Sequence, residues 1–160
     1  MQVYILRHGI AEESSPGGRD PDRALTNEGR KKLREVLRVA EKADVVPGVI
    51  LTSPYVRAVQ TAEAAIDVLG YANDLLRTEA LLPMSHPQEV WEEIRVHQGI
   101  MQLMLVGHEP LLSKVVAFLL NSSTLQVDMK KGALIRIDID DFGAQPRGVL
   151  KWMLVPKLAA

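Results

Sequence analysis

The chain has 160 residues, of which 47% are hydrophobic and 24% charged, a composition typical of one globular domain. The formal net charge of −1 gives no basic surplus for nucleic acid, and the lack of cysteine excludes disulfides and thiolate metal sites. No segment is typical of a signal peptide or is long and apolar enough to span a bilayer. We therefore expect a single cytoplasmic domain over residues 1–160, with no nucleic-acid or membrane partner and with a monomer favoured.

The first predicted element is a short buried strand at residues 3–6, which runs directly into Arg7, His8 and Gly9. Residues 10–25 then show neither helical nor strand periodicity. Loops of that length inside compact domains are usually functional or disordered, so this loop could lie over a site as a lid or form mobile surface.

A helix is predicted to begin after Thr26, which is a good N-cap residue. Its core stripe recurs at helical spacing and comprises Leu33, Val36, Leu37 and Ala40. Gly29 in the first turn costs helix stability, and close approach of a neighbouring loop would give it a use.

Two more buried strands, at 49–52 and 100–106, each lead into a helix. Ser53 and Pro54 favour a helix start with serine as N-cap and proline at the first position. A turn over residues 107–110 opens the other helix. The remaining expected elements are a weak strand at 75–77, a helix from Pro87 to about Val96, and strands at 134–140 and 149–155.

Strands alternate with helices along the chain, and the last two strands form a hairpin. This order predicts an α/β fold, a three-layer α/β/α sandwich with a mostly parallel central sheet and a C-terminal edge hairpin.

Unusual polar residues follow three of these strands. Arg7 and His8 follow the first, Arg57 lies in the first helical turn after the second, and His108 follows the fourth. Because the carboxyl ends of parallel strands share one edge of a sheet, two arginines and two histidines could share one pocket there.

This set of side chains suits a phosphoryl group. Arginine grips phosphate oxygens with paired donors, and helix N-termini add backbone N–H groups. A neutral His8 could attack phosphorus, and His108, if protonated, could donate to an oxygen as charge develops. The two guanidinium groups should lower the pKa values of both histidines.

Each motif alone is a weak signal, and the joint placement at successive strand ends favours the functional interpretation. His86 and His97 lack that placement and are predicted to be structural. A metal site is disfavoured because no carboxylate lies at ligand spacing beside His8 or His108.

The same residues resemble the histidine phosphatase superfamily, which has the phosphoglycerate-mutase-like fold. The matching segments, in order, are Leu6-Arg7-His8-Gly9, Leu25-Thr26-Asn27-Glu28-Gly29, Ser53 to Ala62 and Val106-Gly107-His108-Glu109-Pro110. Within the superfamily the chain looks most like the small SixA-type phosphohistidine phosphatases, with Ala11 and Leu82-Pro83 as further points of similarity.

The resemblance implies that His8 is the phosphorylated nucleophile, that Arg7, Arg57 and His108 form the phosphate pocket with Gly9 beside them, and that no metal or organic cofactor is used. Other branches protonate the leaving group with a carboxylic acid, for which Glu79 is the nearest candidate here. A weak general acid favours P–N over P–O substrates, because a protonated phosphoimidazole leaves as neutral imidazole.

We therefore expect a phosphatase that acts through phosphohistidine on His8. The expected substrate is a protein phosphohistidine, of the kind carried by histidine phosphotransfer proteins. The alternatives are a phosphatase for a small phosphorylated metabolite and, less favoured, a phosphate- or phosphohistidine-binding module with little turnover.

Overall fold

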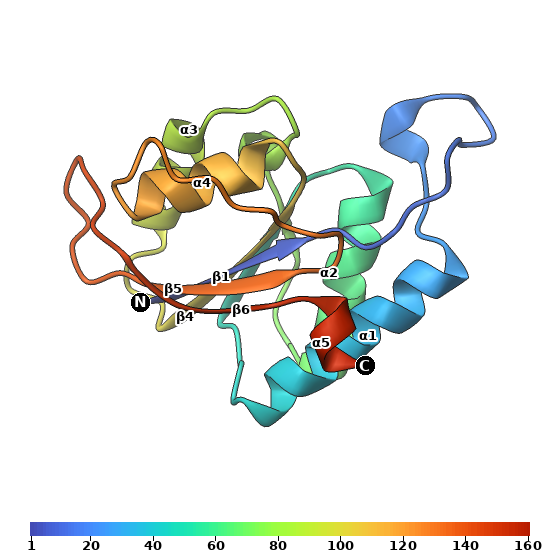
Figure 1. The fold of residues 1–160 in the computed structure, drawn as a ribbon, viewed down its shortest axis with the longest axis horizontal. Helices are drawn as coiled ribbons and strands as arrows, with labels where there is room; N and C mark the ends of the chain where they lie inside the picture. Colours follow the sequence, from blue (N-terminus) through green and yellow to red (C-terminus); the bar gives the residue numbers. More distant parts are fainter.

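The computed structural model describes all of residues 1–160 and contains one six-stranded sheet with helices on both faces (Figure 1). The strands are β1 (Gln2–Arg7), β2 (Val49–Thr52), β3 (Leu76–Arg77), β4 (Gln102–Gly107), β5 (Leu134–Asp138) and β6 (Val149–Leu154). The α-helices are α1 (Asn27–Lys42), α2 (Val56–Leu69), α3 (Pro87–Val96), α4 (Leu111–Leu119) and α5 (Pro156–Ala159). Two short 3₁₀ helices are η1 (Asp20–Asp22) and η2 (Glu79–Leu81). No helix combines the length and the apolar character that crossing a membrane requires.

The strand order is β3-β2-β4-β1-β5-β6. The first four strands in this order pair in parallel, whereas β5 pairs antiparallel with β1, and β6 pairs antiparallel with β5 at the edge. The expected architecture is therefore confirmed, including the hairpin of the last two strands.

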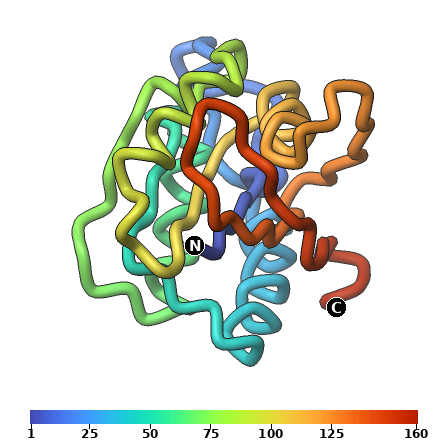
Figure 2. Tube along the Cα trace, turned by 90° about the vertical axis from the view of Figure 1, so that its left-hand side faces the viewer, coloured from blue at the N-terminus to red at the C-terminus, as the bar shows by residue number.

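The sheet separates two hydrophobic cores. On one face α3 and α4 pack over a cluster that includes Trp91, Leu112 and Ile5. On the other face α1 and α2 pack over a cluster that includes Leu33 and Ala62. Figures 1 and 2 show these helices on opposite sides of the sheet, with the β5–β6 turn folded against α3. Residues 3–6 of β1 and 103–107 of β4 are buried throughout, as expected for central strands covered on both faces.

The strand registers bring the three polar junctions to one level. Arg7 pairs with Gly107 at the ends of β1 and β4, and Thr52 of β2 pairs with Val106. Residues 8, 53 and 108 therefore leave the sheet side by side. The 10–25 loop lies at this same end of β1, opposite the N-terminus (Figure 1).

The start of α1 agrees with the sequence prediction, because the Thr26 side chain accepts a hydrogen bond from the Gly29 amide. The start of α2 differs. The helix begins at Val56 with Tyr55 as its N-cap residue, so the assignment of Ser53 as N-cap and Pro54 as first helical residue is wrong. The Ser53 hydroxyl instead bonds to His108, which lies 55 residues away in sequence.

Candidate active site

Two histidines face each other where β1 and β4 end. The ring centroids of His8 and His108 are 5.0 Å apart, and both residues are buried, with 6% and 1% exposure. Tyr55, which precedes α2, places its ring 5.1 Å from that of His108. The predicted convergence of the strand ends is thus present.

The hydrogen bond of His8 identifies its reactive nitrogen. His8 Nδ1 lies 2.7 Å from the carbonyl oxygen of Gly9, and a carbonyl only accepts, so Nδ1 carries the proton. In the neutral ring Nε2 then holds a lone pair and makes no hydrogen bond within the protein. The Gly9 amide donates to Thr61 Oγ1 at 3.2 Å, which fixes the backbone that holds the ring.

The tautomer of His108 follows from Ser53. His108 Nε2 lies 2.7 Å from Ser53 Oγ, and this oxygen also accepts from the Tyr55 amide at 3.3 Å. The Ser53 hydroxyl proton has no other acceptor, so the hydrogen-bond network assigns it to His108 Nε2. His108 Nδ1 is then an N–H donor, and it is buried without a partner in the protein.

Both arginines are anchored at one end of the guanidinium group and free at Nε. Arg7 Nη1 donates to the carbonyl oxygen of Met129 at 2.7 Å, and Arg57 Nη1 donates to that of Asp20 at 2.9 Å. The Nε atoms of Arg7 and Arg57 and Nδ1 of His108 are the only buried side-chain polar atoms without a hydrogen-bond partner. Buried polar groups are normally paired, so these three unpartnered donors beside His8 form a candidate anion site.

Both histidines are neutral in the free protein. Burial, assisted by the charges of Arg57 and Arg7, lowers the pKa of His8 to about 4 against the opposing effect of its bond to Gly9. Burial, the neighbouring His8 and Arg57 lower the pKa of His108 to about 2. The two arginines lower the pKa values of both histidines, as expected, but burial lowers them more. Because His108 is neutral, its donor role depends on its tautomer and not on protonation.

The other sequence candidates make no hydrogen bond or ion pair with these four residues. Glu79 begins η2, is exposed, and its carboxylate makes no hydrogen bond or ion pair, so its role as general acid stays a prediction. His86 and His97 cap the two ends of α3, and neither bonds to a site residue. The structure holds no group of three or more His, Asp or Glu side chains placed to bind a metal ion.

Two residues of the site were missed by the sequence analysis. Asp20 reaches Arg57 from the aperiodic 10–25 loop, and no local pattern marks it. The sequence marks Ser53 only as a helix cap. The D-x-x-R spacing of Asp20 and Arg23 indicates their local ion pair, in which Arg23 Nε donates to Asp20 Oδ1 at 2.8 Å, but it does not indicate the contact with Arg57.

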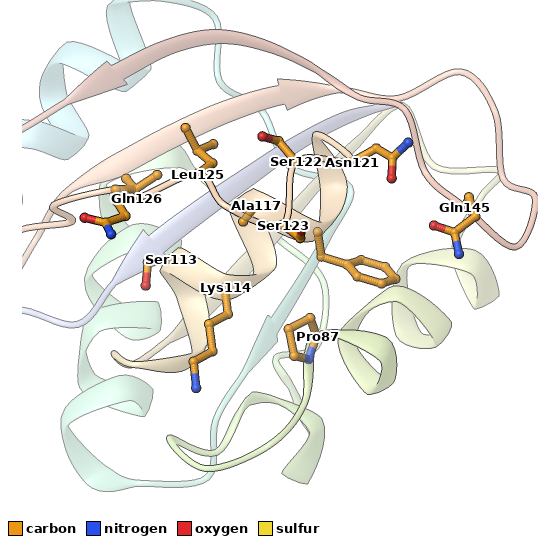
Figure 3. A pocket seen from close by; sticks show the side chains of 12 residues that line it. Pro87, Ser113, Lys114, Ala117, Asn121, Ser122, Ser123, Leu125, Gln126 and Gln145 are labelled. Carbon is orange, nitrogen blue, oxygen red and sulfur yellow. The ribbon is translucent and has the colours of Figure 1, made fainter.

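A separate pocket of about 490 Å³ lies between α4, the loop that follows it and the β5–β6 turn (Figure 3). Lys114 is the only charged residue in its lining, which contains no histidine or arginine. This pocket is therefore not the anion site.

The fold, and a site that holds two histidines and two arginines, indicate an α/β enzyme that acts on phosphoryl groups. The model of the histidine phosphatase superfamily (branch 1) matches residues 3–85, more than half of the chain. The chain belongs to this superfamily and is a phosphatase.

Relatives and solved structures agree with this assignment. The chain is 27% identical over 158 residues to phosphohistidine phosphatase SixA of Escherichia coli K12, covering 98% of this chain and 94% of that protein. It is 32% identical over 127 residues to a SixA homologue of Haemophilus influenzae, covering 73% and 76% of the two chains. The structure of protein histidine phosphatase SixA complexed with tungstate matches with a TM-score of 0.86 at 25% identity, over 98% of each chain.

Proposed function

We propose that this phosphatase hydrolyses phosphohistidine carried by a protein, through a covalent phosphohistidine formed on His8 Nε2. The observation that carries the proposal is the group of three buried, unpartnered N–H donors around a neutral imidazole. These donors match the oxygens of a phosphoryl group, and the relatives named as phosphohistidine phosphatases support the substrate class.

In the first step, His8 Nε2 attacks phosphorus as the bond from phosphorus to the substrate imidazole breaks. Arg7, Arg57 and His108 Nδ1–H hold the phosphoryl oxygens while charge is redistributed among them. A substrate imidazole protonated on its other nitrogen leaves as a neutral molecule, so it needs no further proton. An alkoxide leaving group needs a proton, and none of these four side chains offers an acidic one.

In the second step, water attacks phosphorus and the bond from phosphorus to His8 breaks. The oxygen of water becomes the fourth phosphate oxygen, and the protons of water are shared between the departing phosphate and solvent. His8 regains its free Nε2 because Gly9 keeps the proton on Nδ1 throughout.

A protein-borne imidazole also fits the openness of this edge of the sheet. Only three residues, 53–55, join β2 to α2, and only three, 108–110, join β4 to α4. Two longer segments lie beside the site: the 10–25 loop, and residues 120–133, in which the Met129 carbonyl oxygen accepts from Arg7 and the Gly132 amide donates to the His8 carbonyl oxygen. The phosphoryl partner is thus proposed to be a phosphoprotein, with a small phosphorylated metabolite as the alternative.

Phosphate release from three substrates tests the proposal, using a phosphohistidine protein, a phosphoramidate and an alkyl phosphate. His8→Ala should lose at least ~1000-fold in kcat, as removal of a nucleophile does. His86→Ala, which removes an exposed histidine outside the site, should match the wild type. The wild type should prefer both P–N substrates over the alkyl phosphate.

Rapid acid-free quenching with labelled substrate should trap base-stable, acid-labile phosphate on the wild type and none on His8→Ala. Full activity of His8→Ala would refute the mechanism. A preference of the wild type for alkyl phosphate would assign the enzyme to small phosphomonoesters instead.

A further inference from the structure

Arg57 is held by a residue from a distant loop. Its side chain is 5% exposed, and Nη2 lies 3.2 Å from Asp20 Oδ2 while Nη1 donates to the Asp20 carbonyl oxygen at 2.9 Å. The outer edge of the guanidinium group therefore bonds to Asp20 twice, once to the side chain and once to the backbone.

The other edge of the same group faces the anion site. In a guanidinium ion, Nε–H and one N–H of Nη2 point the same way and form a second fork. Arg57 Nε is buried and has no partner in the protein. A phosphoryl group can use this inner fork without displacing Asp20 from the outer edge.

Asp20 is itself fixed by a second arginine. Arg23 Nε donates to Asp20 Oδ1 at 2.8 Å, and Arg23 Nη1 donates to the carbonyl oxygen of Glu12 at 2.9 Å. Although its partial burial acts to raise the pKa of Asp20, hydrogen bonds and charges from Arg23 and Arg57 lower it below the usual value. The carboxylate is thus ionised at neutral pH and is held between two cations.

We propose that Asp20 is a positioning residue, which holds the outer edge of Arg57 so that the inner fork faces the phosphoryl group. This inference deepens the proposed function and rests on it for the identity of the substrate. A long arginine side chain has many rotamers, and fixing one of them before substrate binds favours both binding and the transition state.

Asp20 could have the opposite role: its carboxylate would compete with phosphate for Arg57 and would be displaced when phosphate binds. The two roles predict opposite changes in anion affinity when Asp20 is removed. A positioning residue makes inorganic phosphate bind more weakly in its absence, and a competitor makes phosphate bind more tightly. The unpartnered Nε atom of Arg57 favours the positioning role.

The test compares Asp20→Ala and Asp20→Asn with Asp22→Asn as matched control. Asp22 lies in the same 3₁₀ helix, and its only ion pair is with Arg19 at 3.7 Å on the surface. Calorimetric titration with inorganic phosphate should show about tenfold weaker binding for Asp20→Ala, a smaller loss for Asp20→Asn, which keeps an oxygen acceptor, and none for Asp22→Asn.

A double-mutant cycle with Arg57→Ala separates positioning from general damage to the loop. In the Arg57→Ala background, Asp20→Ala should change phosphate affinity and kcat/KM by less than about twofold, because the group it positions is gone. Thermal melting establishes that each variant is folded. Tighter phosphate binding by Asp20→Ala, or an undiminished effect in the Arg57→Ala background, overturns the proposal.

These binding measurements do not depend on turnover. If the wild type fails to hydrolyse phosphohistidine but phosphate affinity falls as stated, the proposed substrate is wrong and the role of Asp20 stands. If turnover is as proposed and phosphate affinity is unchanged, the role of Asp20 is wrong.

Discussion

The hydroxyl group of Ser53 determines which ring nitrogen of His108 carries the proton, and so whether Nδ1 is a donor toward the candidate anion site. Ser53 is fully buried, and its oxygen lies 2.7 Å from His108 Nε2. Without this hydroxyl the proton of neutral His108 can move to Nε2. The lone pair of Nδ1 would then face the phosphoryl oxygens and repel them.

We therefore predict that Ser53→Ala lowers kcat/KM about 10- to 100-fold, the effect of losing one donor at a developing charge. Nitrogen NMR of the imidazole should show His108 protonated on Nδ1 in the wild type and largely on Nε2 in the variant. Ser14→Ala, at an exposed residue whose hydroxyl makes no hydrogen bond in the protein, is the control. An unchanged tautomer with normal activity would contradict the assignment.

The residues that could be found from sequence are those with a strong local signal. Their approximate placement follows from the order of elements, because Arg7 ends β1, His8 and His108 each follow a strand, and Arg57 lies in the first turn of α2. The local sequence at Ser53 predicts a helix cap, because a serine before proline is usually one. Its true partner lies across the sheet, and only the register of β2 and β4 brings the two together.

At the level of elements, the first turn of α1 is docked on the chain that follows His8. A Cβ atom built at Gly29 would lie 2.2 Å from the carbonyl oxygen of Ile10 and 2.9 Å from its nitrogen. The Thr26 amide donates to that same carbonyl oxygen at 2.9 Å. The prediction of a close loop at Gly29 is therefore confirmed, and the contact anchors the segment that leaves the site.

Gly29→Ala should lower the free energy of unfolding by about 2–4 kcal/mol, because a backbone segment must move to admit the methyl group. The sign of this change is informative, because replacing glycine by alanine inside a helix normally stabilises the helix by about 1 kcal/mol. Urea denaturation measures the change. Gly17→Ala, in the 10–25 loop with no atom within 4 Å of the added carbon, should be nearly neutral. A stabilised Gly29→Ala would show that the docking is loose.

Most helices and strands could be predicted from the sequence, but the exact residues at which they begin and end were predicted less well. The helix at Pro87–Val96 agrees in both ends with its sequence prediction, because a proline and a hydrophobic stripe mark it. The structure of the 10–25 loop was not predictable, because its contacts are non-local. Arg57, 37 residues from Asp20, supplies a contact that ties this loop to the site.

At the scale of the whole molecule, the two site histidines lower the free energy of unfolding at acidic pH. His8 and His108 are buried as neutral rings in the company of Arg7 and Arg57. Their pKa values of about 4 and about 2 lie below the ordinary 6.5. The unfolded chain therefore binds more protons than the folded chain below pH about 6.5, and stability rises with pH in that range.

This difference predicts that lowering the pH from 7.5 to 5 costs about 2 kcal/mol of unfolding free energy for each of the two histidines. Urea denaturation at both values measures it, in a range where most carboxylates stay ionised. His8→Asn removes one titrating group, so its loss should be about half that of the wild type, whereas His86→Asn should behave as the wild type does. In the unfolded chain both histidines take up protons near their ordinary pKa of 6.5. Equal stability at pH 7.5 and pH 5 would therefore mean that His8 and His108 take up protons in the folded protein as well. In that case His8 would be cationic near pH 6, its Nε2 lone pair would be lost, and nucleophilic attack on phosphorus would have to occur at higher pH.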